Sequence, residues 1–175
     1  MDSNKDFKTH KAMTWAACNK LDKLWRSDLH ESIKINLFRA IIEPILLYGS
    51  ETWTLTSKQQ KRLDGTYTNL LRRVKNIHWK QHATTSRIYG DLPLISHKLS
   101  QRRTQFAGHC FRASGEIVSS LLLWKPPHPN HSNRLTYPDV ISRDTGIRVN
   151  DLPMAMADHA VWKEIVHSLP AEAAE

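Results

Sequence analysis

Apolar side chains recur at helical intervals through most of this chain, and this pattern constrains its fold more than any other feature. Between residues 29 and 46 they form a broad stripe: Leu29, Ile33, Leu37, Ile41 and Ile45, widened by Phe38, Ile42 and Leu46. A spacing of three or four residues places side chains on one face of an α-helix. We therefore expect one strongly buried face here, and a kink or an end at Pro44, which lacks a backbone donor.

Further helices are predicted on either side of this stripe. After a frayed polar start at 1–12, a short amphipathic helix is expected at 13–25, and Ser27 is expected to cap the next helix. The remaining helices are expected to start at Thr56, Ser96 and Asp151, with short ones at 86–89 and 138–145. The helix after Thr56 has one apolar face, and Gly49 and Gly146 are expected to end the helices that precede them. No segment is a convincing strand. The predicted fold class is therefore mainly α, an irregular assembly of several short helices with little or no sheet.

The sequence is expected to divide into four segments. A helical segment at 1–55 precedes a basic helical region at 56–124, and a closing helical segment occupies 137–175. Residues 125–136 are predicted to form a linker, because proline, asparagine and histidine crowd there.

No targeting or membrane segment is predicted. No apolar run approaches the roughly 18 residues that a membrane-spanning helix needs, and the polar N-terminus lacks the apolar core of a signal peptide. Cys18 and Cys110 cannot build a disulfide framework and are expected to be free thiols. We therefore expect a cytoplasmic or nuclear protein that is not secreted and has no membrane partner.

The positive charge of the chain is concentrated in its middle third. The formal net charge is +8, yet residues 58–112 hold twelve Lys and Arg against only Asp64 and Asp91, a local net charge of +10. A localised basic surface is typical of proteins that bind a polyanion. RNA or DNA is therefore the expected partner, and the alternative is a solvated surface that happens to be basic.

The sequence offers no set of residues for catalysis or for a cofactor. No two acidic residues are adjacent, so the clustered carboxylates of two-metal phosphoryl transfer are missing. His109 precedes Cys110, but neighbours on a helix point in different directions, and the ten histidines have no metal-site spacing. We therefore expect no enzyme activity, no metal, no cofactor and no small-molecule substrate.

Two arginine doublets and one tryptophan are the main candidates for contact with nucleic acid. Guanidinium groups match phosphate oxygens, and an aromatic ring among basic residues can stack on a base. Only Trp79, between His78 and Lys80, has such a setting, and the other tryptophans are expected in the core. The candidate nucleic-acid-binding residues are Arg72, Arg73, Lys75, Trp79, Lys80, Arg102, Arg103 and Arg112.

The alternative for each arginine doublet is a structural role, in which the side-chain stem lies along its helix and the guanidinium pairs with a carboxylate. Asp64 and Asp91 are the only acids nearby in the sequence, too few to neutralise both doublets. This shortage favours contact with phosphate. For Trp79, core packing is the alternative.

A longer motif runs through the chain in a fixed order. It comprises Tyr48, Gly49, Ser50, Glu51, Thr52 and Trp53, then Leu71, Arg72, Arg102, Arg103, Phe106, Gly108, His109, Trp124 and Lys125. In order and approximate spacing, these residues resemble the region that follows the catalytic domain in the reverse transcriptases of non-LTR (LINE-type) retrotransposons. The likeness covers about residues 15–162, and none of the matching positions is catalytic in that family.

The resemblance implies a fold and a role. The segment at 27–53 is similar to the helical thumb that grips the template–primer duplex, so 1–55 is expected to be thumb-like. The remainder is similar to the helical C-terminal extension, which helps to hold RNA template and target DNA. At 128–134 the chain departs from the family, which has a basic Arg-Gly-Arg-Pro-like stretch there.

Two functions remain open from the sequence. The first is a non-catalytic fragment of a retrotransposon reverse transcriptase that binds RNA or DNA weakly, with little sequence preference, through its basic helical surface. The second is a decayed or recruited helical domain without a nucleic-acid role, acting at most in protein–protein interaction. Salt-dependent binding to RNA or DNA separates the two.

Overall fold

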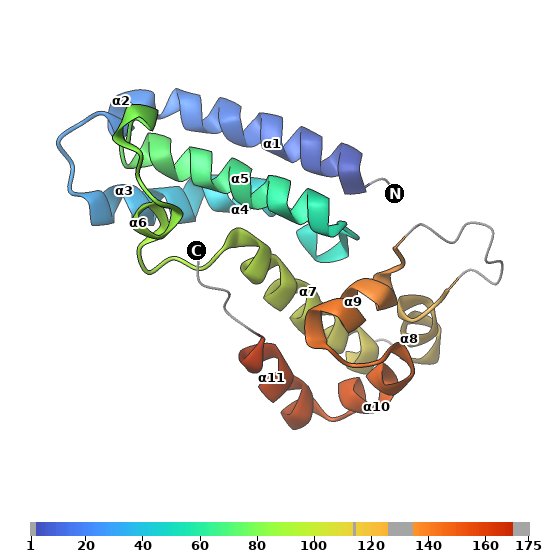
Figure 1. The fold of residues 1–175 in the computed structure, drawn as a ribbon. Helices are drawn as coiled ribbons and strands as arrows, with labels where there is room; N and C mark the ends of the chain where they lie inside the picture. Colours follow the sequence, from blue (N-terminus) through green and yellow to red (C-terminus); the bar gives the residue numbers. More distant parts are fainter. Residues whose placement is uncertain (1–2, 114, 126–134, 170–175) are drawn as a thin grey trace. The chain divides into compact units, whose positions relative to one another are not determined.

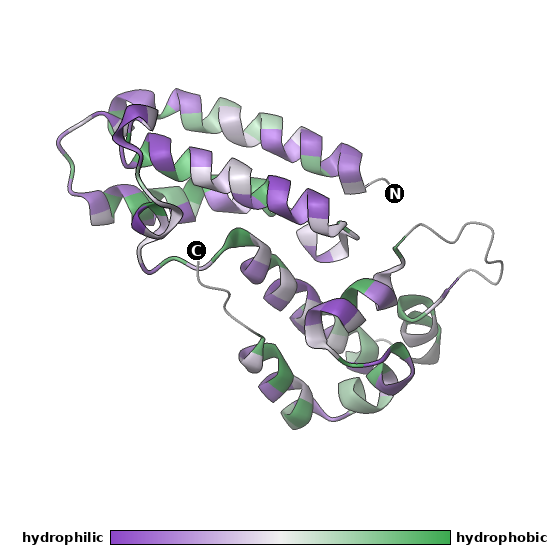
Figure 2. Ribbon diagram, in the orientation of Figure 1, coloured by the Kyte–Doolittle hydropathy of each residue, from purple (hydrophilic) through white to green (hydrophobic). Residues whose placement is uncertain are grey.

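The computed structural model describes residues 3–113, 115–125 and 135–169, and helices dominate it (Figure 1). No strand occurs among these residues, so the predicted mainly α fold with little or no sheet is confirmed. Hydrophilic and hydrophobic residues alternate along the longer helices, as the purple and green bands in Figure 2 show. This banding is the amphipathic pattern expected of helices that bury one face.

Contacts divide the described residues into two units. Unit 1 contains residues 3–48 and 57–96, and unit 2 contains residues 49–56 and 97–169. Each unit encloses its own buried side chains, and we describe the two separately.

The four segments expected from the sequence remain a prediction, since they follow the order of the chain and not its contacts: 1–55, 56–124, 125–136 and 137–175. Residues 126–134 lie outside the described residues. They include most of the predicted linker and the departure from the retrotransposon family at 128–134.

Unit 1 is built around two long helices and a helical run that lie side by side (Figure 1). The long helices are α1 (Ser3–Lys20) and α5 (Ser57–Val74), and the run consists of α3 (Glu31–Leu37), η1 (Phe38–Ile42) and α4 (Glu43–Leu46). Shorter elements complete the unit: α2 (Asp22–Trp25), η3 (Trp79–Gln81) and α6 (Thr85–Tyr89). The predicted short helix at 86–89 is therefore confirmed as α6.

Helix α1 begins earlier than predicted. The expected frayed start is wrong for residues 3–12, which belong to this helix. Its buried residues are Phe7, Thr14 and Cys18, spaced seven and four positions apart, so a narrow stripe faces the rest of unit 1. Because only three residues carry that stripe, its period is a weak signal in the sequence.

The broad apolar stripe at 29–46 is buried on a different face from the one predicted. Phe38, Ile42 and Leu46, expected only to widen the stripe, are fully buried. Three members of the expected stripe are exposed instead: Leu29, Ile33 and Ile41. Successive residues turn by about 100° around a helix, so the two sets occupy adjacent faces. Only one of these faces meets α1 and α5.

The kink predicted at Pro44 takes the form of a π-helical turn. The π turn η1 directly precedes α4, and Pro44 lies in the first turn of α4. Pro44 has no N–H for the carbonyl of Ala40, and its ring would clash with that carbonyl in a regular α-helix. A wider turn relieves the clash, so the helix continues to Leu46. Gly49, with φ of 64°, ends this run as predicted.

Two of the predicted capping residues have other partners. The hydroxyl of Ser27 donates to a carbonyl of the preceding turn, and His30 caps α3 by accepting from a backbone amide. Helix α7 (Ile95–Ala113) begins one residue before Ser96. Asp64 Oδ1, from α5, accepts from the backbone N of Ser96 at 3.0 Å, so a carboxylate distant in sequence satisfies this helix start.

Unit 2 packs short helices around α7 (Figure 1). They are α8 (Gly115–Leu122), α9 (Tyr137–Thr145), α10 (Leu152–Ala157) and α11 (His159–Ser168), with short 3₁₀ turns η2 (Ser50–Thr52) and η5 (Val149–Asp151). The core consists of Ala107, Ile141, Leu152, Met156 and Trp162. The prediction of a helix at 138–145 is confirmed by α9.

The starts of α9 and α11 are capped by aspartates. Thr136 and Asp139 form a reciprocal capping box, and Gly146 ends α9 as predicted. Burial alone would raise the pKa of Asp139, but hydrogen bonds from Lys125 and Thr136 outweigh it and hold that pKa below its usual range. The closing helix predicted from Asp151 is divided into two helices. Helix α10 starts directly after Asp151, whose side chain forms no capping hydrogen bond, and α11 is capped by Asp158, whose Oδ1 accepts from two backbone amides.

A buried arginine connects three parts of unit 2. Arg103, on α7, has no solvent exposure. Its Nε and Nη2 donate to Asp144 Oδ2, the former at 2.9 Å, and its Nη1 donates to the carbonyl of Trp53 at 2.8 Å. Burial lowers the pKa of Arg103, while the charge of Asp144 acts in the opposite direction. Residues 49–56 are thus anchored to α7 and α9 through side-chain donors.

Gly108 allows Trp162 to pack against α7. A Cβ added at Gly108 would overlap Cδ1 and Nε1 of the buried indole, whose Nε1 donates to the carbonyl of Thr104 at 2.9 Å. We therefore expect Gly108→Ala to destabilise unit 2 by about 1–3 kcal/mol in urea unfolding, because the ring must shift and lose this hydrogen bond. An unchanged unfolding midpoint would show that Trp162 is not packed as described.

Cys18 and Cys110 are free thiols, as expected. Burial raises the pKa of both, and at Cys18 it outweighs the nearby Arg73 guanidinium, so both thiols are protonated at neutral pH. Separately, no helix in the described part of the chain is long and apolar enough to cross a membrane.

Candidate nucleic-acid interface

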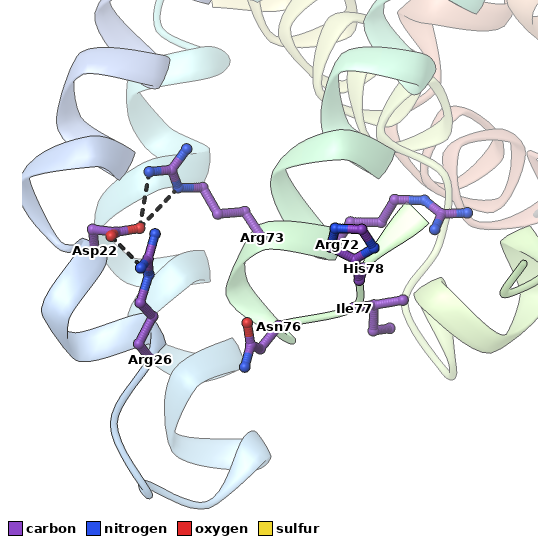
Figure 3. Close-up of a pocket in the computed structure, with 7 residues that line it drawn as sticks. All are labelled: Asp22, Arg26, Arg72, Arg73, Asn76, Ile77 and His78. Atoms are coloured by element: carbon purple, nitrogen blue, oxygen red, sulfur yellow. Dashed lines mark hydrogen bonds and ion pairs between the residues drawn. The ribbon is translucent and has the colours of Figure 1, made fainter. Parts of the chain in front are cut away.

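The C-terminal end of α5 opens onto a basic pocket in unit 1. The pocket encloses about 470 Å³ and is lined by Asp22, Arg26, Arg72, Arg73, Asn76, Ile77 and His78. We call it the Arg73 pocket (Figure 3). Three arginines and a single carboxylate contribute to its lining, so its net charge is positive.

Arg73 and Arg26 share one carboxylate at this pocket. Arg73 Nη2 donates to Asp22 Oδ1 at 2.8 Å, and Arg26 Nε lies 2.9 Å from Asp22 Oδ2. One negative charge therefore holds two guanidinium groups in place, as the dashed lines in Figure 3 show. Both arginines remain partly exposed and keep donors for a further anion.

Arg72 reaches in the opposite direction from Arg73 (Figure 3). Its Nη2 donates to the carbonyl of Ala83 at 2.8 Å, which ties the end of α5 to the chain before α6. Its Nη1 is buried and makes no hydrogen bond to any residue that the structure describes. Arg72 thus combines a structural contact with an unused donor.

A short turn after the pocket presents Trp79 to solvent. Trp79 is 69% exposed, and the Nζ of Lys80 lies 5.8 Å from the centre of its ring. His78 caps this turn by accepting from the backbone N of Lys80, and its ring lies 5.7 Å from that of Trp79. We call His78, Trp79 and Lys80 the Trp79 turn. Its exposed indole and adjacent cation suit stacking against a base beside a phosphate.

The side chains of the other predicted residues pair with, or are buried among, other residues of the protein. The Lys75 side chain, only 9% exposed, pairs with Glu31, and Arg102 lies 3.5 Å from Glu51 in unit 2. Arg112 is exposed and donates to the carbonyl of Met156 at 2.8 Å. Arg103 is wholly buried, and this burial leaves it out of any surface that nucleic acid could contact.

Acidic residues are scarce near the arginine doublets in the sequence, but not in the folded protein. Arg73 pairs with Asp22, Arg102 lies near Glu51 and Arg103 pairs with Asp144. All three carboxylates come from outside residues 58–112. The argument that local acids are too few therefore fails, because the fold supplies distant ones.

Three of the five tryptophans expected in the core are buried. They are Trp25, Trp53 and Trp162, whereas Trp15 is only partly buried, and Trp79 is exposed. Trp124 was expected in the core but is 59% exposed, since it lies beyond the end of α8. An exposed indole is therefore not unique to Trp79, but Trp79 directly follows His78, which lines the Arg73 pocket.

Five residues that line the pocket were not among the predicted site residues: Asp22, Arg26, Asn76, Ile77 and His78. Arg26 lies four residues after Asp22 at the end of α2, a spacing that places the two side chains together. Asn76 has a positive φ of 55°, which turns the chain sharply after α5. The helical spacing of Asp22 and Arg26 was readable in the sequence, whereas their approach to Arg73 was not.

The described residues hold no group of three or more His, Cys, Asp or Glu side chains that could bind a metal ion. The site combines arginines, two of which share the carboxylate of Asp22, with one lysine, a histidine and an exposed tryptophan. Such a set can bind an anion through charge-assisted hydrogen bonds and a flat ring through stacking.

These features define a helical protein with a basic, aromatic surface site. Over 119 residues, 64% of this chain, the sequence is 29% identical to an uncharacterized transposon-derived protein of Caenorhabditis elegans. The match spans 43% of that relative's length. It supports a transposon-related origin for the chain. No protein-family profile matches the sequence, and no solved structure matches it.

Proposed function

We propose that this chain is a non-catalytic part of a retrotransposon reverse-transcriptase protein that binds RNA or DNA weakly and with little sequence preference. The observation that carries the proposal is the Trp79 turn beside the Arg73 pocket. Phosphate oxygens would accept from Arg26 and Arg73, while a base stacks on Trp79. The similarity to a transposon-derived relative and the sequence motif from Tyr48 to Lys125 support the same origin.

The expected binding mode follows from the chemistry of the site. Guanidinium and ammonium groups contact the sugar–phosphate backbone and carry no sequence information themselves. Stacking on an indole tolerates every base. The protein should therefore prefer single strands, whose bases are free to stack, and discriminate little among sequences.

Replacing Trp79 with Ala tests this function. We expect single-stranded oligonucleotides to bind more weakly by about 1–3 kcal/mol, because the stacking contact is lost. Binding of a duplex with the same sequence should be nearly unchanged, since its bases are already stacked. Fluorescence anisotropy with both ligands measures the difference.

Trp124→Ala is the matched control for this experiment. Trp124 is also exposed, but Lys125 beside it pairs with Asp139, and it belongs to unit 2, whereas the Arg73 pocket belongs to unit 1. Its replacement should leave single-strand binding close to that of the wild type. Equal losses in the two variants, or no loss in either, would contradict the stacking role of Trp79.

A protein-interaction role is the second candidate. It is favoured by exposed apolar side chains on the run α3–η1–α4 and directly before it: Leu29, Ile33 and Ile41. Exposed apolar side chains that gather in one patch mark interaction surfaces in soluble proteins. If the chain binds no nucleic acid at any salt concentration, the protein-interaction role is the candidate that remains.

A further inference from the structure

A second basic groove lies between α1 and α5 in unit 1. It encloses about 350 Å³ and is lined by Asn4, Phe7, Lys8, Lys11, Arg62, Gly65, Thr66 and Asn69. We call it the α1–α5 groove. Its lining contains three cations and no carboxylate.

The cations of this groove are less neutralised than those of the Arg73 pocket. Lys8, Lys11 and Arg62 are exposed, and none forms an ion pair with a residue that the structure describes. In the Arg73 pocket, by contrast, Asp22 offsets one of the positive charges. Like charges held together without a counter-charge repel one another, so an anion between them is favoured.

The groove and the pocket lie along the same side of α5. Arg62 and Arg73 are eleven residues apart, about three helical turns, so their directions differ by only about 20° and their positions by about 16 Å along the axis. Asn69 lies between them on the same face and also lines the groove. Helix α1 follows α5 over this length: its first half meets Arg62, and Asp22, just beyond its end, meets Arg73.

Gly65 lines the groove and has no side chain to fill it. It lies inside α5 with an ordinary helical backbone, where glycine is about 1 kcal/mol less favourable than alanine. A Cβ added there would meet no atom within 4 Å other than those of the neighbouring backbone of α5. Packing therefore does not require glycine at this position, whereas a ligand that approaches the helix backbone closely would.

We propose that the α1–α5 groove binds phosphates of the same nucleic-acid strand that occupies the Arg73 pocket. The inference rests on the proposed nucleic-acid function and extends it to Lys8, Lys11, Arg62 and Gly65. The separation of about 16 Å spans roughly three to five phosphates of one strand. One strand thus runs along the α1–α5 side of unit 1 and reaches Trp79 at the end of α5.

Two triple variants of the full chain test the groove against a labelled single-stranded 20-mer. Lys8→Gln/Lys11→Gln/Arg62→Gln removes the groove cations. Lys20→Gln/Arg39→Gln/Arg87→Gln removes three exposed cations that line neither site. Both lower the net charge equally, so long-range attraction to the ligand changes to the same extent. Circular dichroism confirms that each variant remains helical.

We expect the groove variant to reduce the slope of log K against log salt by about 2 units, since each phosphate contact on a single strand contributes about 0.7. The control variant should reduce it by less than about 0.5. Equal slopes in the two variants would overturn the groove while leaving the proposed function intact. Absence of binding by the wild type would instead refute the proposed function itself.

Gly65→Ala provides a second test, because it should raise thermal stability and lower affinity for the ligand. The variant should melt at a higher temperature, because alanine favours the helix, and should bind the 20-mer at least about threefold more weakly, because the methyl group occupies the groove. Higher stability with unchanged affinity would show that no ligand approaches Gly65 and would overturn this part of the inference.

Discussion

Replacing Asp144 with Asn is expected to destabilise unit 2 by about 3–5 kcal/mol, one of the two largest effects that we predict. The substitution leaves the guanidinium of Arg103 buried without a counter-charge. Asp144 Oδ2 accepts from both Nε and Nη2 of that group, and both side chains are almost fully buried. Urea unfolding of the full chain, followed by circular dichroism, measures the loss.

Asp151→Asn is the matched control for this substitution. Asp151 also pairs with an arginine, Arg148, at 2.8 Å, but both side chains are largely exposed. Surface ion pairs of this kind contribute between about 0 and 1 kcal/mol. A similar small loss at Asp144 would contradict the buried pair.

The double variant Arg103→Met/Asp144→Leu separates charge from shape. Replacing both partners of a buried ion pair with apolar residues is often neutral or stabilising, because no group remains buried with its charge uncompensated. We expect the double variant to be more stable than either single variant, with some loss remaining because Arg103 also binds the carbonyl of Trp53. Strictly additive losses would argue against direct coupling.

Nucleic-acid affinity is expected to fall steeply with salt, the second large effect. If four to six phosphates are neutralised, log K for a single strand falls by about 3 to 4 units per unit of log salt. Between 50 and 200 mM salt, this slope corresponds to about a hundredfold loss of affinity. The loss reflects the release of condensed counterions when cations of the protein replace them.

Two variants of the Arg73 pocket should have opposite effects on nucleic-acid binding. Arg72→Gln/Arg73→Gln removes two cations and should reduce the slope by about 1 to 2 units. Asp22→Asn removes the carboxylate shared by Arg26 and Arg73, so it should tighten binding at low salt. Weaker binding in both variants would indicate that the pocket serves the fold and not the ligand.

The helices could be predicted from the sequence because their signals are local. The stripe of α5 and the glycine that ends α9 each act within a few residues, and both were predicted. The sequence could not predict which face of α3–η1–α4 is buried. Apolar residues occupy two adjacent faces of that run, and the positions of α1 and α5 decide which face is covered.

The candidate site was only half predictable, for a related reason. Composition and spacing identified Arg73, Trp79 and Lys80, which lie at or beside the pocket. They could not identify the carboxylates that pair with the candidate arginines, since Asp22 is 51 residues from Arg73 and Asp144 is 41 residues from Arg103. Such pairings depend on tertiary structure, so Arg103 resembled a phosphate ligand in the sequence and is a buried structural residue in the fold.

The most direct test of the nucleic-acid function is a titration of the wild-type chain with a single-stranded 20-mer at several salt concentrations between 50 and 200 mM. We expect weak binding with a slope of about −3 to −4 in log K against log salt, and similar affinities for oligonucleotides of different sequence. A flat salt response, or no binding at the lowest salt concentration, would contradict the nucleic-acid function of this chain.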